Sequence, residues 1–191
     1  LGGYAIGYDI FEGNIYEGHT LIAFIEKITV KFNLDKPIIV ADSGLLSREN
    51  ILALEEKKYE YIIGARLKNE PEKIKQQILG KKLTDGDIVK IKRSVDTRLI
   101  VTYANNRAAK DEHNRKRGLQ RLEKQIKSGK LTKSSINNKG YNKYLKLQGN
   151  ILIEIDYEKF NKDHAWDGLK GYITNTKIPD KQVIENYKNL W

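Results

Sequence analysis

The sequence predicts an α/β fold, in which a mixed sheet with flanking helices is interrupted by a strand-rich, basic insertion domain. Three observations support this prediction. Residues 1–65 alternate between strand-like and helix-like patterns, an order that builds a largely parallel sheet with right-handed crossovers. From about residue 67 the chain becomes polar and then strongly basic. An apolar strand pattern returns only at 169–175. The expected division is a core over 1–67, an insertion over 68–168, and a return to the core over 169–191.

The first core segment is expected to hold three strands and two helices. Loose alternation predicts a half-buried strand over 1–11, and Thr20 can cap a helix with apolar residues at helical spacing. The run 38–41, rich in β-branched residues and preceded by Pro37, predicts a short strand buried on both faces. Ser47 is the expected cap of the next helix, which leads to a strand at 59–65.

The remaining elements follow from the same periodicities. We expect a polar helix at 69–82, a turn at 85–87, paired strands at 88–94 and 98–103, a helix at 106–127, a loop at 128–144, strands at 145–147, 151–157 and 169–175, and a last helix at 180–191. Pro179 suits the start of that last helix.

Composition narrows the function classes. The 191 residues carry a formal charge of +10, which favours a polyanionic partner such as nucleic acid. No cysteine is present, so disulfides and thiolate metal sites are excluded. No long apolar run or signal-peptide pattern occurs, and a soluble intracellular protein is expected. The lack of methionine and the strand-like opening at Leu1 indicate a fragment of a longer protein.

Asp42 is the candidate catalytic residue. It follows the strand at 38–41, and catalytic groups in α/β sheets gather beyond the carboxyl ends of the strands. Its carboxylate can therefore serve as a metal ligand or a base. The alternative is a helix cap, although Ser47 is better placed for that task, which leaves Asp42 without an obvious structural role.

The segment 105–146 is the candidate nucleic-acid surface. It contains 13 basic and three acidic residues. The basic side chains expected to contact phosphates are Arg115, Lys116, Arg117, Arg121, Lys124, Lys127, Lys130, Lys133, Lys139 and Lys143. A merely solvated helix face is the competing interpretation. Tyr141 and Tyr144, which lie among these lysines, either touch bases or anchor the loop.

Several motifs, taken in order, carry a resemblance. They are Phe11-Glu12-Gly13-Asn14 with Glu17-Gly18-His19-Thr20, Val40-Ala41-Asp42-Ser43-Gly44, the strand at 59–65, the basic insert, Thr174-Asn175, and Glu185-Asn186-Tyr187 with Leu190-Trp191. Together they resemble the DDE transposases of bacterial insertion sequences, in the subgroup with a Tyr-Arg-Glu-Lys helix signature. That resemblance implies an RNase H-like core interrupted by a mostly β insertion before the last catalytic helix.

The resemblance also implies a chemistry. In this family three carboxylates hold two divalent ions, Mg²⁺ or Mn²⁺, which cut and rejoin DNA at transposon ends. By position Asp42 resembles the second carboxylate, while the first would precede Leu1 and the third would follow Trp191. Tyr187 matches the signature tyrosine and so implies a DNA contact, but Leu190 stands where an arginine is usual.

Two tryptophans resemble the family's base-stacking aromatics. These are Trp166 and Trp191, for which ordinary packing is the alternative. Because only Asp42 of the three carboxylates is expected in this chain, we expect the fragment to be catalytically silent. The implied partners are transposon-end and target DNA and a second copy of the protein, with no membrane, in the bacterial cytoplasm at the nucleoid. The other hypotheses are a non-catalytic nucleic-acid-binding module, such as a decayed transposase, and an RNase H-like nuclease that cuts without joining strands.

Overall fold

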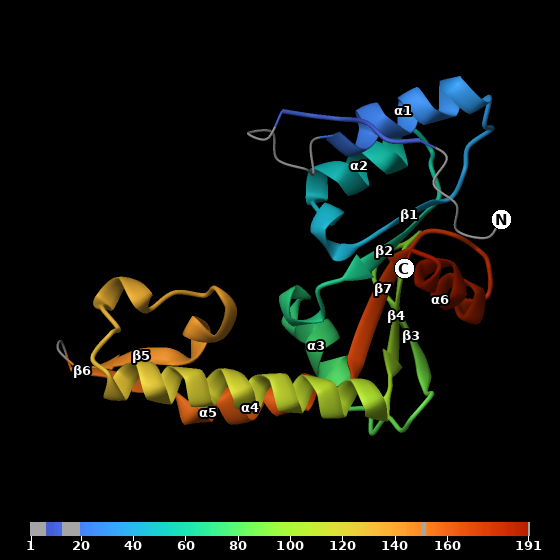
Figure 1. Ribbon diagram of the computed structural model, residues 1–191. Coiled ribbons are helices and arrows are strands. Elements are labelled where there is room, and N and C mark those ends of the chain that lie inside the picture. The colour runs from blue at the N-terminus through green and yellow to red at the C-terminus, as the bar shows by residue number, and fades with distance from the viewer. Residues whose placement is uncertain (1–6, 13–19, 150–151, 191) are drawn as a thin grey trace. The chain divides into compact units, whose positions relative to one another are not determined.

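The computed structural model describes residues 7–12, 20–149 and 152–190. It divides into two compact units, of which the first comprises 1–80, 88–102 and 170–191 and the second 81–87 and 103–169. The first unit holds a five-stranded mixed sheet in the order β1 (Ile39–Ala41), β2 (Tyr61–Ala65), β7 (Leu169–Thr174), β4 (Arg98–Tyr103) and β3 (Ile88–Lys92) (Figure 1). The predicted α/β class with a mixed sheet is confirmed.

Strand directions differ from the largely parallel sheet that was expected. β1 and β2 are parallel, with Ala41 opposite Ile63, whereas β2 pairs antiparallel with β7 and β3 pairs antiparallel with β4. The short turn between β3 and β4 allows only antiparallel pairing, because a parallel connection needs a long crossover. The expected hairpin is therefore present, but as part of the larger sheet.

The position of β1 also differs from the prediction of a strand buried on both faces. β1 is an edge strand among the described residues, and it pairs only with β2. Ala41 is buried, whereas Ile39 and Val40 are half-buried. β-branched residues are favoured on half-buried strands as well as on central ones, so the composition of β1 does not distinguish the two positions.

Helices of the first unit bury apolar stripes. They are α1 (Leu21–Phe32), α2 (Arg48–Glu56), α3 (Glu72–Leu79) and α6 (Asp180–Lys188). The expected cap of α2 is confirmed, since the Ser47 hydroxyl accepts from the Asn50 amide at 3.0 Å. Helix α6 begins after Pro179, as predicted. Its Val183, Ile184 and Tyr187 pack with residues of β2, β4 and β7 in one buried cluster.

The second unit is built on α4 (Asn105–Lys127), which lies within one residue of the predicted helix at its start. A two-stranded antiparallel sheet, β5 (Leu145–Gln148) and β6 (Leu152–Ile155), and α5 (Tyr157–Lys162) complete it. The core cluster holds Leu122, Tyr144, Leu145, Ile155 and Phe160. The expected loop at 128–144 contains two short 3₁₀ helices, 133–135 and 140–144.

The boundaries of these units differ from the expected insertion at 68–168. Helix α3 and the β3–β4 hairpin belong to the first unit, and the second unit takes only 81–87 and 103–169. Composition suggested the earlier boundary because α3 is polar on its exposed face. Sheet pairing, a long-range interaction, decides where the hairpin lies.

Candidate functional site

Asp42 lies immediately beyond the carboxyl end of β1, with its side chain exposed to solvent. Its backbone is extended, and its Oδ1 accepts a hydrogen bond of 2.6 Å from the Gly44 amide. This bond caps the short 3₁₀ helix Ser43–Leu45, so Asp42 does have a structural task, contrary to the expectation. A Cβ on Gly44 would lie 2.8 Å from Oδ1, so glycine allows the chain to turn closely beside the carboxylate.

Helix α6 reaches the same end of β1. A Cβ placed on Gly64 of β2 would lie 2.5 Å from the Tyr187 hydroxyl oxygen and 3.1 Å from the Ser43 nitrogen. The Tyr187 hydroxyl and the Ser43 backbone nitrogen therefore both lie close to the position that a side chain at residue 64 would occupy. The sequence places α6 here because its buried face, which includes Tyr187, packs against the sheet. The end of β1 that carries Asp42, which we call the Asp42 edge, therefore lies beside the second half of α6.

The ring of Tyr187 is a core group. The residue is 4% exposed, and its ring meets that of Tyr172 edge-on at a centroid distance of 4.9 Å. The Lys170 ammonium lies 4.5 Å from the Tyr187 ring centroid. Burial of the ring means that any contact of Tyr187 with DNA falls to its hydroxyl.

Metal binding at Asp42 would need further ligands. Among the described residues, no group of three or more His, Asp or Glu side chains is arranged to hold an ion. Asp42 offers a single carboxylate, and Mg²⁺ bound through one carboxylate alone is held weakly. The described residues therefore do not by themselves fit a two-metal centre.

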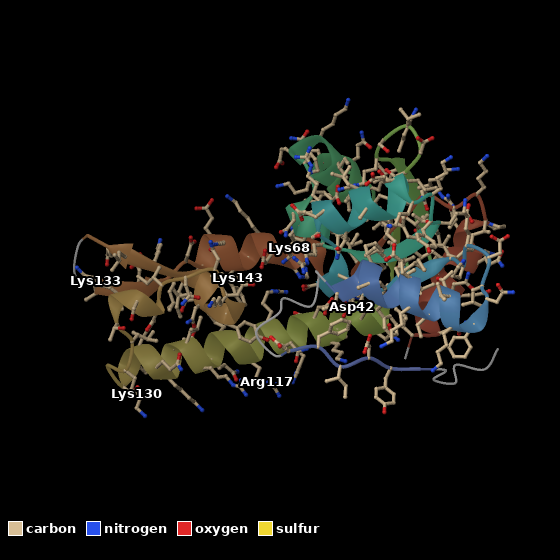
Figure 2. The ribbon with its side chains drawn as sticks, turned by 90° about the horizontal axis from the view of Figure 1, so that it is seen from above. Asp42, Lys68, Arg117, Lys130, Lys133 and Lys143 are labelled. Carbon is tan, nitrogen blue, oxygen red and sulfur yellow. The ribbon has the colours of Figure 1, made fainter. Side chains whose placement is uncertain are left out.

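Helix α4 presents three exposed basic residues on the face opposite its buried stripe. At 100° per residue, Arg117, Arg121 and Lys124 fall on one side, while the buried Leu122 and Gly118 fall on the other. None of these three cations has an ion-pair partner within the described parts of the chain. Figure 2 shows the side chain of Arg117 projecting outward from the helix. This basic stripe is available to an anion.

The other predicted phosphate contacts separate into free and occupied groups. Lys127, Lys130, Lys133 and Lys139 are exposed, and no described residue pairs with them. Lys116 is exposed but pairs with Glu112 at 2.6 Å, and Lys143 pairs with Asp163 at 2.5 Å. Among the ten residues predicted to contact phosphates, the basic stripe of α4 and these four lysines therefore provide most of the positive charge that no described acid neutralises.

Arg115 is placed differently from the prediction. It is 8% exposed, pairs with Asp167, and lies with its guanidinium 5.1 Å from the Phe160 ring centroid. His164 Nδ1 is 3.1 Å from one of its terminal nitrogens. Arg115 is therefore a core cation that joins α4 to the segment after α5, and the spacing of charges along a helix cannot reveal this.

The two tyrosines of the basic segment anchor it. The Tyr144 hydroxyl donates to Asp163 Oδ2 at 2.6 Å, and its ring meets Phe160 edge-on at 5.4 Å. The ring of Tyr141 packs so closely on Gly118 that a Cβ there would overlap it. The anchoring alternative for these two residues is the one that the packing supports.

The tryptophans give little further evidence. Trp166 is half-buried in the short 3₁₀ helix Asp163–Trp166, and Trp191 lies outside the described residues. The sequence interpretation missed Arg66, which follows β2 just as Asp42 follows β1. Because parallel neighbours end at the same edge, a charged residue directly after the predicted strand at 59–65 was the signal that could have identified it.

Comparison with known protein families identifies the family of this chain. The family described as "Transposase DDE domain" matches residues 1–191, the whole of the chain. Neither a curated protein nor a solved structure matches it. None of the described helices is long and apolar enough to cross a membrane. The family match over all 191 residues, together with the mixed α/β sheet, leads to one conclusion: the chain belongs to the DDE transposase family.

Proposed function

We propose that this chain acts in a transposase that cleaves and joins DNA at transposon ends, with Asp42 as one of its metal-binding carboxylates. The observation that carries the proposal is the position of Asp42. Its exposed carboxylate follows β1, and the hydroxyl of Tyr187 from α6 and the backbone nitrogen of Ser43 both lie against Gly64 of the neighbouring strand β2. A carboxylate at a strand end beside a helix is the arrangement from which separate elements can supply ligands to a common ion.

The metal chemistry needs more carboxylates than this edge provides. Two Mg²⁺ or Mn²⁺ ions, when bound, would activate the attacking oxygen and stabilise the leaving oxygen. Within the described residues Asp42 has no carboxylate partners arranged for this purpose. We therefore expect the 191 residues alone to bind DNA without cleaving it, and Mg²⁺-dependent cleavage by this chain would contradict the expectation.

DNA binding is assigned to the basic stripe of α4 and the lysines after it. Arg117, Arg121 and Lys124 are unpaired among the described residues and share one helix face. Lysine and arginine side chains that neutralise phosphates release counterions, so binding weakens as salt increases and is largely independent of sequence. Transposon ends and target DNA are both polyanions that such a surface would hold.

Other features of the proposal follow from the family resemblance. Trp166 and Trp191 are proposed to stack on a displaced base, and two copies of the protein are proposed to act together on paired ends. The proposed location is the bacterial cytoplasm at the nucleoid. For Trp166, which is half-buried, replacement by alanine in the full-length protein should reduce processing of the DNA end. Unchanged processing would remove this residue from the mechanism.

A direct test of Asp42 uses Mn²⁺ as a paramagnetic probe. The amide NMR signals of residues within reach of the bound ion should broaden, with Ser43 and Gly44 among the first. The Asp42→Asn variant keeps an oxygen acceptor for the Gly44 amide but removes the charge, so the fold is expected to survive and the local broadening to disappear. Broadening centred elsewhere, or unchanged in the variant, would remove Asp42 from the metal site.

The alternative function is a non-catalytic nucleic-acid-binding module. The observation that favours it is that the described residues hold no group of three or more His, Asp or Glu side chains arranged around an ion. A strand-transfer assay with the full-length protein distinguishes the possibilities. Joined DNA products that require Asp42 support the transposase, cleavage without joining supports an RNase H-like nuclease, and binding without either product supports the module.

A further inference from the structure

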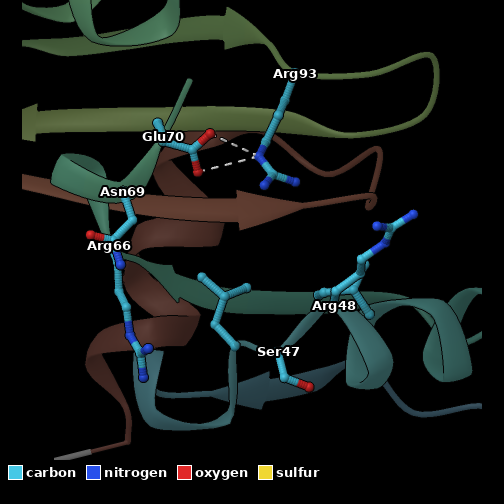
Figure 3. A pocket seen from close by; sticks show the side chains of 8 residues that line it. Ser47, Arg48, Arg66, Asn69, Glu70 and Arg93 are labelled. Atoms are coloured by element: carbon cyan, nitrogen blue, oxygen red, sulfur yellow. Dashed lines mark hydrogen bonds and ion pairs between the residues drawn. The ribbon is translucent and has the colours of Figure 1, made fainter. Parts of the chain in front are cut away.

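A cavity in the first unit lies beside the Asp42 edge. It has a volume of ≈ 440 Å³ and is lined by residues from α2 and its cap, from the segment after β2 and from the end of β3 (Figure 3). This volume falls within the roughly 300–1,000 Å³ that is typical of small-molecule sites. None of its lining residues is among those assigned to the proposed function above.

The cavity is strongly cationic. Three arginines, Arg48, Arg66 and Arg93, line it together with one acid, Glu70, which leaves two positive charges uncompensated. Arg48 and Arg66 are exposed, and no described residue pairs with either side chain. Two guanidinium groups at one cavity repel each other when no acid neutralises them. An anion bound between them would offset that repulsion.

Glu70 orients the third arginine. Its carboxylate, 4% exposed, accepts from Arg93 Nε through both oxygens, at 3.3 and 3.1 Å. The two terminal nitrogens of Arg93 have no partner among the described residues, so they remain available as donors. The Arg93 backbone is fixed as well, because its amide donates to the Thr97 carbonyl at 3.1 Å. A guanidinium held in this way is preorganised for an oxyanion.

Polar and apolar groups complete the lining. The Ser47 hydroxyl and the Asn69 amide supply neutral hydrogen-bonding groups, while Leu46 and Ile51 provide an apolar part. A phosphate attached to a sugar presents both kinds of surface. The lining therefore suits a phosphodiester with its sugar better than it suits an isolated small anion.

Position relates the cavity to Asp42. Because Ala41 is opposite Ile63 in the parallel pair, Asp42 is level with Gly64, and Arg66 lies two residues further along, roughly 7 Å. Ser47 and Arg48 follow Asp42 by only a few residues. We propose that this arginine cavity binds a phosphodiester group of a DNA strand that passes Asp42, an inference that rests on the function proposed above.

The test measures binding of a fluorescein-labelled 20-base-pair duplex to the 191-residue chain by anisotropy at several salt concentrations. The cavity variant is Arg48→Gln with Arg66→Gln, and the charge-matched control is Lys73→Gln with Lys181→Gln, both exposed lysines of the same unit outside the cavity. The cavity variant should bind severalfold more weakly, and its salt slope should fall by about one for each phosphate that is no longer neutralised. The control should change little, and equal weakening in the two variants would overturn the proposal.

Further arms separate the possible failures. If the unmodified chain does not bind the duplex, the proposed function itself fails. If removal of the basic stripe (Arg117→Gln, Arg121→Gln and Lys124→Gln) weakens binding and the cavity variant does not, only the present inference fails. NMR signals of the arginine Nε–H groups should shift with the duplex more than with inorganic phosphate. A response to inorganic phosphate alone would identify a free-phosphate site and overturn the assignment to DNA. Thermal unfolding of every variant checks that its fold is intact.

Discussion

Addition of a single methyl group at Gly64 should push α6 away from the sheet. Its Cβ would lie 2.5 Å from the Tyr187 hydroxyl oxygen, 3.2 Å from Tyr187 Cζ and 3.1 Å from the Ser43 nitrogen. Tyr187 is 4% exposed and packs against Tyr172, so its ring has little room to move away. In Gly64→Ala the added methyl must therefore displace α6, distort the Asp42 turn, or both.

The expected cost follows from overpacking. Methylene insertion into a packed core typically costs about 1–3 kcal/mol. The smaller unfolded-state entropy of alanine returns about 0.4–1 kcal/mol when the backbone tolerates it, and Gly64 has no positive φ. For a chain of this size 1 kcal/mol corresponds to about 2–4 °C in Tm. Gly64→Ala should therefore lower Tm by several degrees.

A double-mutant cycle isolates the contact with the hydroxyl group. Tyr187→Phe removes the atom at 2.5 Å and leaves the ring carbon at 3.2 Å, so it should relieve most of the clash. The free energies of unfolding of the two single variants and the double variant are measured in denaturant. The double variant should be less destabilised than the sum, by about 1 kcal/mol or more. Additive effects, or no destabilisation by Gly64→Ala, would refute the packing described here.

Three further changes have predictable effects on the free energy of unfolding, each measurable by denaturant titration. Gly118→Ala should destabilise by about 1–3 kcal/mol because its Cβ overlaps the ring of Tyr141, and Tyr141→Ala should partly rescue it. Arg115→Ala should cost about 3 kcal/mol because it removes the arginine partner of the Asp167 carboxylate, 10% exposed, and leaves, among the described residues, only His164 Nδ1 beside that oxygen at 2.9 Å; a decrease under 1 kcal/mol would argue against that pairing. Ser47→Ala should cost about 1 kcal/mol through removal of the α2 cap, and Ser47→Gly less.

Locally encoded features of the fold were predictable from the sequence. The cap at Ser47, the start of α6 after Pro179 and the long helix α4 follow from hydrogen-bonding and periodicity rules that act within a few residues. The β3–β4 hairpin was also predicted, because its turn is short. Asp42 was identified by the same kind of reasoning, as a carboxylate at the end of an apolar strand.

Long-range pairing was not predictable. The hairpin joins the core sheet because β4 lies beside β7, and neither strand carries a local signal for that choice. Arg115 cannot be distinguished from its basic neighbours in the sequence, yet it is buried and forms an ion pair with Asp167, which is distant in the chain. The arginine cavity was missed for the same reason, since Arg48, Arg66 and Arg93 come from three separate elements.

Thr174 and Asn175 explain how the chain after the second unit supports the Asp42 edge. The Asn175 side chain accepts from the Tyr61 amide at 2.8 Å and donates to the Tyr59 carbonyl at 3.0 Å, and the Thr174 hydroxyl donates to the Tyr61 carbonyl at 2.6 Å. The side chains of the last β7 residue, Thr174, and of the residue after it therefore add hydrogen bonds between β7 and the start of β2. Because Tyr61 is fully buried, its backbone groups would otherwise be unsatisfied, at about 1–3 kcal/mol each. The pair that contributed to the family resemblance therefore holds in place the strand on which β1 and Asp42 depend.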